Sequence, residues 1–367
     1  MKNILILKSG NSEGVGEQFI QAMCAQYPKD NIFRFNFVAA ESSLPILSSY
    51  YYLKIKNSVD KEIKIIQSEI LKNKIDVIWI VLNSSSLIEV SFHLLKKIDI
   101  PFVAHIWDIP EYLAKTNRLD YLSQKSVLKA FDAICSKAQS IVATSDSMAS
   151  MYGEKYKKPT TTIYFPSIKT TFLKERKESN ETVLKIIFAG SLYAYKEWKF
   201  FLKAIEEHNN SSKQPTIAVS FLGTPSKWAY KPKWVTFEKN LPQKEALQKV
   251  AEADIAYLPY WMDKKHEKTV MTAFPSKLSF YTSAGTPIFY HGPKQSTPYI
   301  FLETNKVGIS CTSIKQNDII SVLTELKSKH FLEQYPQTRN YTFDKYFSID
   351  AASEAMENVA NGKFLSK

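Results

Sequence analysis

The sequence predicts an α/β protein built from two doubly wound, Rossmann-like domains that face a cleft. The chain has 367 residues, and at roughly 150 residues per domain this length indicates two domains. Short apolar runs alternate with helical patterns, which is typical of a parallel sheet covered by helices on both faces. The alternation stops at a polar stretch near the middle of the chain and then restarts, so the same kind of unit occurs twice.

The first domain is predicted over residues 1–167 and contains five strands. Helical patterns separate these strands, for example over 122–137, where apolar residues recur at helical spacing. The predicted strands are Ile4–Leu7, Phe33–Phe37, Asp76–Leu82, Pro101–Ile106 and Ser140–Thr144.

Residues 168–182 are polar and charged and are predicted to be the linker to a second domain, residues 183–345. A helix over Glu197–His208 places its aromatic and aliphatic residues on one face. A last helix, Ile349–Val359, follows a predicted break at Tyr341–Phe347. The predicted strands are Lys185–Ala189, Ile217–Leu222, Val235–Glu238, Asp254–Pro259, Pro287–Tyr290 and Gly308–Cys311.

Composition narrows the class of protein. A hydrophobic share of 44% with 23% charged residues rules out disorder. The three cysteines lie far apart without a C-x-x-C pair, which excludes a disulfide framework or zinc module and suits a reducing cytoplasm. The longest apolar run is Val77–Leu82, so no membrane-spanning helix is expected and membrane contact would be peripheral.

The chain is basic, with 48 Lys+Arg against 36 Asp+Glu and a net charge of +12. Nearly all of this charge is lysine, whereas specific nucleic-acid readers favour the bidentate fork of arginine, so a nucleic-acid partner is not expected. Two interpretations remain for the lysines. They are a solvated surface, or they attract anionic membranes and phosphorylated ligands.

In open parallel sheets, ligands bind beyond the carboxyl ends of the strands, so the loops there are the candidate sites. The loop from Lys8 to Gly16 carries glycines that either form a flexible turn or admit a ligand to a helix start. His105 and Asp108 follow the fourth strand. They either polarise a hydroxyl or hold a sugar, or they are a core histidine beside an N-capping aspartate.

Two further loops lie in the second domain. After Gly190 a lysine, Lys196, stands at a helix start, where the helix dipole disfavours a cation unless a phosphate is bound. Pro275 suits the first helical position, and Ser276 and Lys277 then stand at a second helix N-terminus, which Gly285 and Pro287 would end. Two helix N-termini in one domain that can each bind an anion indicate a diphosphate ligand.

At this segment the sequence resembles a known family. FPSKLSFYTSAGTPI is similar to the donor-binding segment of GT-B glycosyltransferases, especially the large retaining family (group 1 or family 4 type) that builds bacterial surface polysaccharides. FAGSLYAYKEWKFFLKAI resembles that family's glycine loop and phosphate lysine. ADIAYLPY resembles the strand before the donor segment, and IVATSDSM the last strand and helix of the N-terminal domain.

The resemblance implies a division of labour between the domains. The C-terminal domain would bind the nucleotide sugar and the N-terminal domain the acceptor, with residues 346–367 crossing back to the N-terminal domain. The implied catalytic residues are His105, Asp108 and Lys196. The implied donor-binding residues are Gly190, Ser191, Lys196, Thr272, Phe274, Pro275, Ser276, Lys277 and Leu278. The implied acceptor-side residues are Gly14, Gly16 and Trp107.

The sequence also departs from the family pattern. The family carries two glutamates in the donor segment, and these positions fall on Thr272 and Phe280. The usual base after the phosphate-loop glycine is Ser191, which leaves Lys196 as the matching lysine. The family's histidine–aspartate site matches either His105 or Trp107 together with Asp108.

The resulting hypothesis is a retaining, metal-independent glycosyltransferase without a cofactor, placed in the cytoplasm or on the inner membrane face. It would use a nucleotide-diphosphate sugar and a saccharide or lipid-linked acceptor, as in capsule or O-antigen synthesis. Phe280 cannot accept a ribose hydrogen bond, which favours a deoxyribose donor such as dTDP-rhamnose. If Thr272 takes over the ribose, UDP- or GDP-sugars remain open. The alternatives are a catalytically degenerate nucleotide-binding protein and a sugar-nucleotide epimerase.

Overall fold

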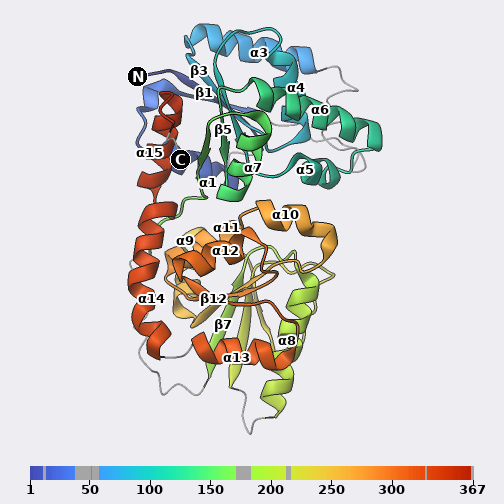
Figure 1. The fold of residues 1–367 in the computed structure, drawn as a ribbon, viewed down its shortest axis with the longest axis vertical. Coiled ribbons are helices and arrows are strands. Elements are labelled where there is room, and N and C mark those ends of the chain that lie inside the picture. The colour runs from blue at the N-terminus through green and yellow to red at the C-terminus, as the bar shows by residue number, and fades with distance from the viewer. Residues whose placement is uncertain are drawn as a thin grey trace. The chain divides into compact units, whose positions relative to one another are not determined.

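The computed structural model describes residues 1–10, 14–37, 51, 58–170, 183–211, 216–326 and 329–364. The chain divides into two compact units (Figure 1). The first unit comprises Met1–Pro166 and Ile349–Lys367, and the second comprises Ser167–Ser348. The last helix of the chain therefore belongs to the first unit. Residues 171–182 of the predicted linker lie outside the described residues.

The first unit contains a parallel sheet of six strands in the order β2-β1-β3-β4-β5-β6. Five of these strands coincide with the predicted apolar runs to within two residues at each end. The sixth, β6, is an edge strand of three half-buried threonines that carries no apolar signal. The strands are β1 (Ile4–Ser9), β2 (Ile32–Phe37), β3 (Val77–Val81), β4 (Phe102–Ile106), β5 (Ser140–Ala143) and β6 (Thr160–Thr162).

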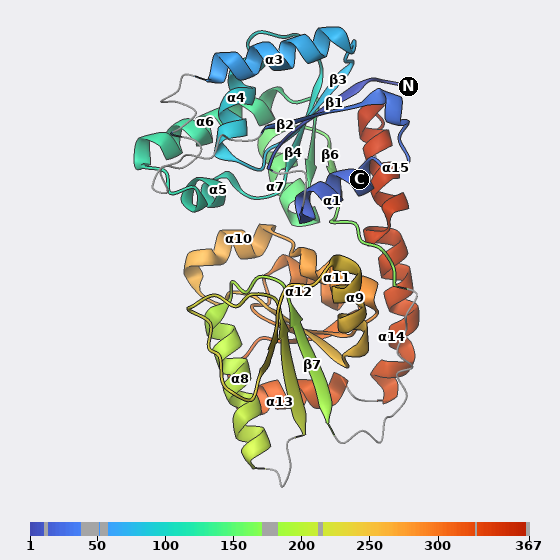
Figure 2. The same ribbon diagram turned by 180° about the vertical axis from the view of Figure 1, so that it is seen from behind.

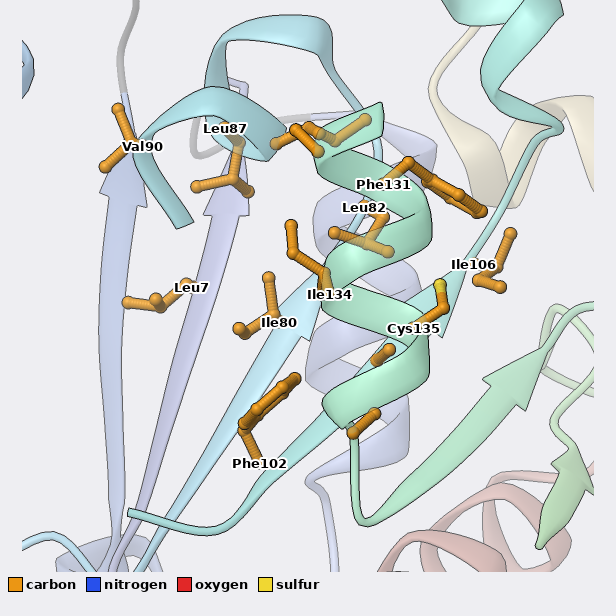
Figure 3. Close-up of a cluster of buried hydrophobic side chains, with 14 of the residues drawn as sticks. Leu7, Ile80, Leu82, Leu87, Val90, Phe102, Ile106, Phe131, Ile134 and Cys135 are labelled. Atoms are coloured by element: carbon orange, nitrogen blue, oxygen red, sulfur yellow. The ribbon is translucent and has the colours of Figure 1, made fainter. Parts of the chain in front are cut away.

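Successive residues of a strand point to opposite faces of the sheet. Helices cover both faces, so both are buried. Leu5, Leu7, Ile78 and Ile80 join one cluster with α3 to α7. Figure 3 shows α6 lying across this face with Phe131, Ile134 and Cys135 directed at the strands. Residues of alternate register join α1 and α15 on the other face. The helices are α1 (Val15–Met23), η1 (Lys29–Asn31), α3 (Val59–Lys72), α4 (Ser85–Leu94), α5 (Pro110–Thr116), α6 (Tyr121–Lys137), α7 (Asp146–Tyr156) and α15 (Ile349–Ala360).

The second unit contains another parallel six-stranded sheet, in the order β12-β11-β10-β7-β8-β9. The strand order reverses between β7 and β10, which lie side by side at the centre of the sheet. In open α/β sheets this switch point is where ligands bind. The strands are β7 (Leu184–Ala189), β8 (Ile217–Leu222), β9 (Thr236–Glu238), β10 (Ile255–Pro259), β11 (Ile288–His291) and β12 (Gly308–Cys311).

Helices cover both faces of the second sheet (Figure 2). The aromatic face of α8 packs on one side together with α13, and α9 and α11 pack on the other. The two predicted doubly wound domains are thus confirmed as two parallel sheets with flanking helices. The helices are α8 (Tyr195–Asn210), α9 (Gln243–Glu252), η2 (Lys264–His266), α10 (Glu267–Thr272), α11 (Ser276–Ala284), α12 (Thr297–Asn305), α13 (Gln316–Leu326), α14 (Lys329–Thr342) and the π-helix η3 (Phe343–Phe347).

The predicted break at Tyr341–Phe347 is wrong. α14 runs to Thr342 and continues as the π-helix η3, and the helical backbone stops only at Ser348, which is extended. The buried rings of Phe343 and Phe347 belong to this wider turn. A π turn keeps the chain helical while changing the residue spacing, so the apolar pattern loses its regular period. In the part of the chain that the structure describes, no helix is long and apolar enough to cross a membrane.

Candidate functional site

The switch point of the second unit is lined by glycine backbone. Gly190 follows β7 and Gly223 follows β8, and both adopt positive φ angles, +94° and +142°. A Cβ on Gly223 would lie 3.0 Å from the carbonyl oxygen of Gly190. Glycine is therefore needed at Gly223 for its conformation and for the close approach of the two loops.

Lys277 lies beside this glycine loop. It is the second residue of α11, and a Cβ on Gly190 would lie 3.6 Å from its Nζ. Nζ is 4.9 Å from the ring centroid of Tyr193 and 5.5 Å from that of Phe188. Burial lowers the pKa of Lys277 to about 8. No carboxylate among the described residues forms an ion pair with this lysine.

These features make the Lys277 site suited to an anion. A half-buried ammonium with no counter-ion among the described residues stands at a helix N-terminus, where the unpaired backbone N–H groups and the helix dipole also favour negative charge. The flanking rings add cation–π attraction, and no described residue accepts a hydrogen bond from the amine. The chemistry of the site therefore fits the phosphates of a ligand.

The stacked rings of Trp261 and His266 form an aromatic wall beside the same site. This wall was not predicted from the sequence. Trp261, after β10, donates from Nε1 to the carbonyl oxygen of Tyr193, 3.0 Å away, and so ties together the two loops at the switch point. The Trp261 ring stacks on His266 at 4.4 Å and 17°. His266 in turn pairs through Nδ1 with Asp263 at 2.7 Å. The sequence feature that could have predicted this wall is the aromatic pair Tyr260-Trp261, directly after a strand.

The structure separates the remaining predicted donor residues. Ser276 is half-buried as the first residue of α11, whereas Ser191 is exposed. Lys196 is also exposed, and its Nζ lies 5.9 Å from the ring centroid of Phe200, one turn further along α8. Pro275 is the N-cap of α11 rather than its first residue, because its backbone is extended.

Three predicted donor residues take part in packing. The hydroxyl of Thr272 donates to the carbonyl oxygen of Lys268 in its own helix, 2.8 Å away. Phe274 is buried and packs edge-on against Phe301 at 5.0 Å, and Leu278 is fully buried. Of the predicted donor set, the structure therefore brings together Gly190 and Lys277, with Ser276 adjacent in sequence.

In the first unit, Asp108 lies just beyond the carboxyl end of β4. It is half-buried, and burial raises the pKa of its carboxyl to about 6. Within the described ranges it has no ion pair or hydrogen bond to another side chain. The N-cap of the following helix, α5, is Ile109 and not Asp108, so the N-capping interpretation is wrong. Asp108 is thus a carboxyl group that takes up a proton more readily than an ordinary aspartate.

His105 is fully buried in β4. The indole Nε1 of Trp79 is 3.1 Å from its Nδ1, and that of Trp107 is 3.2 Å from its Nε2. Burial lowers the pKa of His105 to about 3, so the imidazole is neutral. A neutral imidazole has a single acceptor nitrogen, so only one of these indoles donates a full hydrogen bond. These contacts favour the core-histidine interpretation.

The two predicted acceptor-side glycines of the first loop, Gly14 and Gly16, have different surroundings. Gly14 is the N-cap of α1 with φ of +104°. A Cβ on Gly16 would lie 2.9 Å from the Trp107 ring, and Phe19 stacks on the same ring at 5.3 Å and 21°. Gly16 therefore makes room for the tryptophan that precedes Asp108.

Comparisons with known proteins identify the fold. No protein-family model matches the chain, and no curated protein matches it in sequence. Sucrose-phosphate synthase from Thermosynechococcus elongatus superimposes with a TM-score of 0.69 at 11% identity over 98% of each chain. Anabaena HepE in complex with UDP and glucose gives 0.66 at 13% identity, covering 98% of this chain and 100% of that one. The apo lipopolysaccharide outer core galactosyltransferase WaaB gives 0.64 at 12% identity, covering 99% and 100%.

These neighbours are GT-B glycosyltransferases, so the chain has the GT-B fold that its sequence segments resemble. At such low identity the likeness establishes the fold alone. What the chain does must be argued from its own site.

Proposed function

We propose that this protein is a glycosyltransferase that moves a sugar from a nucleotide-diphosphate sugar to a saccharide or lipid-linked acceptor. The observation that carries the proposal is the Lys277 amine. It lies half-buried and without a described counter-ion at the N-terminus of α11, beside the glycine loop at the switch point of the second sheet.

The chemistry of transfer explains this arrangement. Breaking the bond between sugar and phosphate leaves a diphosphate that gains negative charge in the transition state. Lys277 and the N-terminus of α11 supply positive charge at fixed positions, which stabilises the leaving group without reorganisation. Lys196, at the start of α8, is the second lysine that we assign to the phosphates. This mechanism needs no metal ion or cofactor, and we expect activity to persist in EDTA.

On the acceptor side we assign the carboxyl group of Asp108. A carboxyl with a pKa near 6 exchanges its proton close to neutral pH and can accept a hydrogen bond from a sugar hydroxyl. Trp107, held by Gly16, contributes an aromatic face beside it. Retention of configuration at the transferred sugar is part of the proposal, as the sequence resemblance implies.

The neighbours with bound ligands support a nucleotide-sugar donor. HepE binds UDP-glucose, and a trehalose-6-phosphate protein from E. coli, with a TM-score of 0.61 at 8% identity, binds UDP-2-fluoro glucose. For this chain we propose a dTDP-sugar, because Phe280 of α11 is half-buried and offers no acceptor for a 2′-hydroxyl. UDP- and GDP-sugars are the competing donors.

A second candidate is a nucleotide-binding protein that does not transfer sugar. It is favoured by Thr272, whose hydroxyl bonds within its own helix, and by Phe280, since neither position supplies a carboxylate. A sugar-nucleotide epimerase would instead convert the donor without any acceptor.

A thermal-shift series with dTDP, UDP and GDP tests the binding step, because a ligand of the folded state stabilises it by mass action. Incubation of the stabilising nucleotide's sugar with and without acceptors then separates the three functions. Transfer supports our proposal, conversion without acceptor indicates an epimerase, and stabilisation without turnover indicates the non-catalytic protein. No stabilisation by any nucleotide would overturn all three.

The lysine excess also supports a peripheral location on the cytoplasmic membrane face, as in surface polysaccharide synthesis. Tyr121 and Leu122 at the start of α6 are 68% and 74% exposed, and Lys125 lies over the Tyr121 ring at 4.5 Å. Exposed apolar side chains beside lysines suit the headgroup region of an anionic leaflet.

A further inference from the structure

Arg339 of α14 is a buried arginine, 2% exposed, whose donors are directed at the carboxyl end of α11. Its Nε donates to the carbonyl oxygen of Thr282 at 2.7 Å, and its Nη2 to that of Ser283 at 2.5 Å. Its Nη1 donates to the side-chain oxygen of Asn340 at 2.8 Å. Carbonyls in the last turn of a helix lack the usual intrahelical partners. The cap residue Gly285 donates to Thr282 at 3.1 Å, and Arg339 adds donors to both Thr282 and Ser283.

This arrangement is a costly way to gain stability. No carboxylate in the described part of the chain forms an ion pair with Arg339, and burial lowers the pKa of its guanidinium although Asp344 attracts it from a greater distance. A cation is favourable at a helix carboxyl end, but removing an unpaired charge from water carries a large penalty. What the guanidinium fork provides in return is geometry, since its donors have fixed directions.

The points where the chain passes between the two units meet the same turn of α11. At the first crossing, Ser167 donates from its backbone N–H to the carbonyl oxygen of Phe347, at the second crossing, over 2.8 Å. The Ser167 hydroxyl donates to that of Ser283 at 2.9 Å, and the N–H of Thr170 to the Ser283 carbonyl at 3.1 Å. Arg339 and the first crossing thus hold one end of one helix, and the second crossing is bonded to the first through Ser167.

The other end of this helix carries Lys277. α11 has nine residues and is about 13 Å long, so it moves as a short rigid rod. Tyr281 attaches it to the sheet by accepting a hydrogen bond from the backbone N–H of Ala189 at 3.0 Å. Lys277 makes ring contacts rather than hydrogen bonds to described residues, so its position follows that of the helix.

We propose that Arg339 is a positioning residue for the Lys277 amine, acting through α11. By fixing the carboxyl end of α11 to α14, Arg339 sets how closely the amino end approaches the glycine loop. The inference deepens the proposed function and relies on it for the choice of a nucleoside diphosphate as one probe.

The test compares Arg339→Met and Arg339→Lys with the control Lys345→Met. Lys345 is an exposed cation of the adjoining η3 that bonds to Tyr341. The first measurement is the pKa of Lys277, followed by NMR on the reductively methylated protein and assigned with Lys277→Arg. Among the described titratable side chains, Tyr193 lies against Lys277 and no carboxylate pairs with it, so this pKa reports how deeply the amine is buried. The second measurement is the affinity for dTDP and UDP by calorimetry.

We expect Arg339→Met to move the Lys277 pKa from about 8 toward the ordinary 10.5. It should weaken nucleotide binding by about tenfold or more, because small displacements of a binding group have large effects. Arg339→Lys should restore part of both properties, and Lys345→Met should change neither. A folded Arg339→Met protein with unchanged pKa and affinity would overturn the proposal.

Absence of nucleotide binding and failure of Arg339→Met to fold are two further outcomes, and each has its own consequence. If the wild-type protein binds neither nucleotide, the proposed function fails and the pKa measurement alone decides the role of Arg339. If circular dichroism shows that Arg339→Met does not fold, Arg339→Lys and Ser167→Ala replace it. Ser167→Ala removes one hydrogen bond to the same turn, so it should shift both properties in the same direction. Unchanged values in both variants would overturn the proposal.

Discussion

The two units end their parallel sheets in opposite ways. The first presents a carboxyl group, Asp108, beyond β4, and the second presents an amine, Lys277, beside the loop that follows β7. Burial pushes both toward their neutral forms, raising the pKa of Asp108 to about 6 and lowering that of Lys277 to about 8. The shared doubly wound fold thus does not decide the charge of a site, which depends on a few residues at the strand ends.

The switch points differ as well. In the first unit the loops after β1 and β3 are fastened by Asn83, which donates to the Ser9 carbonyl at 2.7 Å and accepts from its N–H at 3.1 Å. Close by in sequence, Lys8 pairs with Glu17 at 2.9 Å. In the second unit the corresponding loops carry Gly190 and the aromatic wall, and Lys277 has no such carboxylate among the described residues. We infer that the second unit is the one prepared for an anion.

The largest effect should come from removing the Lys277 amine. Lys277→Met should lower transfer activity by about 100-fold or more, since a preorganised charge on the leaving group is lost. The same variant should be more stable than the wild type at pH 7, because it no longer buries an ammonium. Steady-state kinetics and urea denaturation measure the two effects.

Lys196→Met is the matched control for that variant. Lys196 is exposed near Phe200, so its removal should leave stability unchanged and reduce activity less than Lys277→Met does. If Lys196→Met abolished activity and Lys277→Met did not, the assignment of the phosphate site would move to α8.

Removing the Asp108 carboxyl group of the first unit should lower transfer activity without changing nucleotide binding. Asp108→Asn should reduce transfer by roughly 100-fold, the scale of one acid–base group, while dTDP or UDP binding at the second unit stays intact. Calorimetry on the variant checks the second half of this expectation. Loss of nucleotide binding in Asp108→Asn would contradict the division between the two units.

The pH dependence of stability sharpens this expectation. The folded pKa of Asp108, about 6, exceeds its ordinary value of 3.8, so the folded state binds the proton more tightly. Wild-type stability should therefore fall as pH rises from about 4 to 6, by at most about 3 kcal/mol at 1.36 kcal/mol per pKa unit. Partial exposure of the group lowers this figure. Asp108→Asn should lack the loss, so the two unfolding curves should separate above pH 6 and coincide below pH 4.

A smaller effect is expected in the pH dependence of nucleotide binding. Lys277 is lowered to a pKa of about 8, and a bound phosphate would raise it again by favouring the charged form. Affinity for dTDP or UDP should therefore be constant below pH 7 and fall by up to about tenfold per pH unit above 8. Lys277→Met should abolish this fall in affinity at alkaline pH. A fall in affinity that begins only near pH 10 would indicate that exposed lysines bind the nucleotide instead.

The sequence predicted the sheets because their strands are continuous apolar runs such as Val77–Val81, while β6 escaped because Thr160–Thr162 carries no apolar residue. Gly190 and Lys277 were found because they belong to a local segment with recognisable helix signals. The aromatic wall at Trp261 and the attachment of Arg339 were not found, because both depend on loops and helices that meet only in three dimensions. Likewise, the burial that shifts the pKa of Asp108 comes from neighbours distant in sequence.

The smallest expected effect concerns Gly16, the glycine that packs against Trp107. Gly16→Ala would place a Cβ 2.9 Å from the Trp107 ring, and such overpacking typically costs about 1–3 kcal/mol. The free energy of unfolding, measured in urea, should fall by this amount, and activity should decline with the displaced Trp107–Asp108 segment. The affinity for dTDP and UDP should not change, since Lys277 and its helix belong to the other unit.

Gly153, also in the first unit, offers the control, because a Cβ there would lie 2.8 Å from a Thr160 methyl group, at the sheet edge and away from Asp108. Gly153→Ala should lower stability while leaving activity intact. Equal losses of activity in both variants would mean that Gly16 acts on stability alone and that Trp107 does not position Asp108.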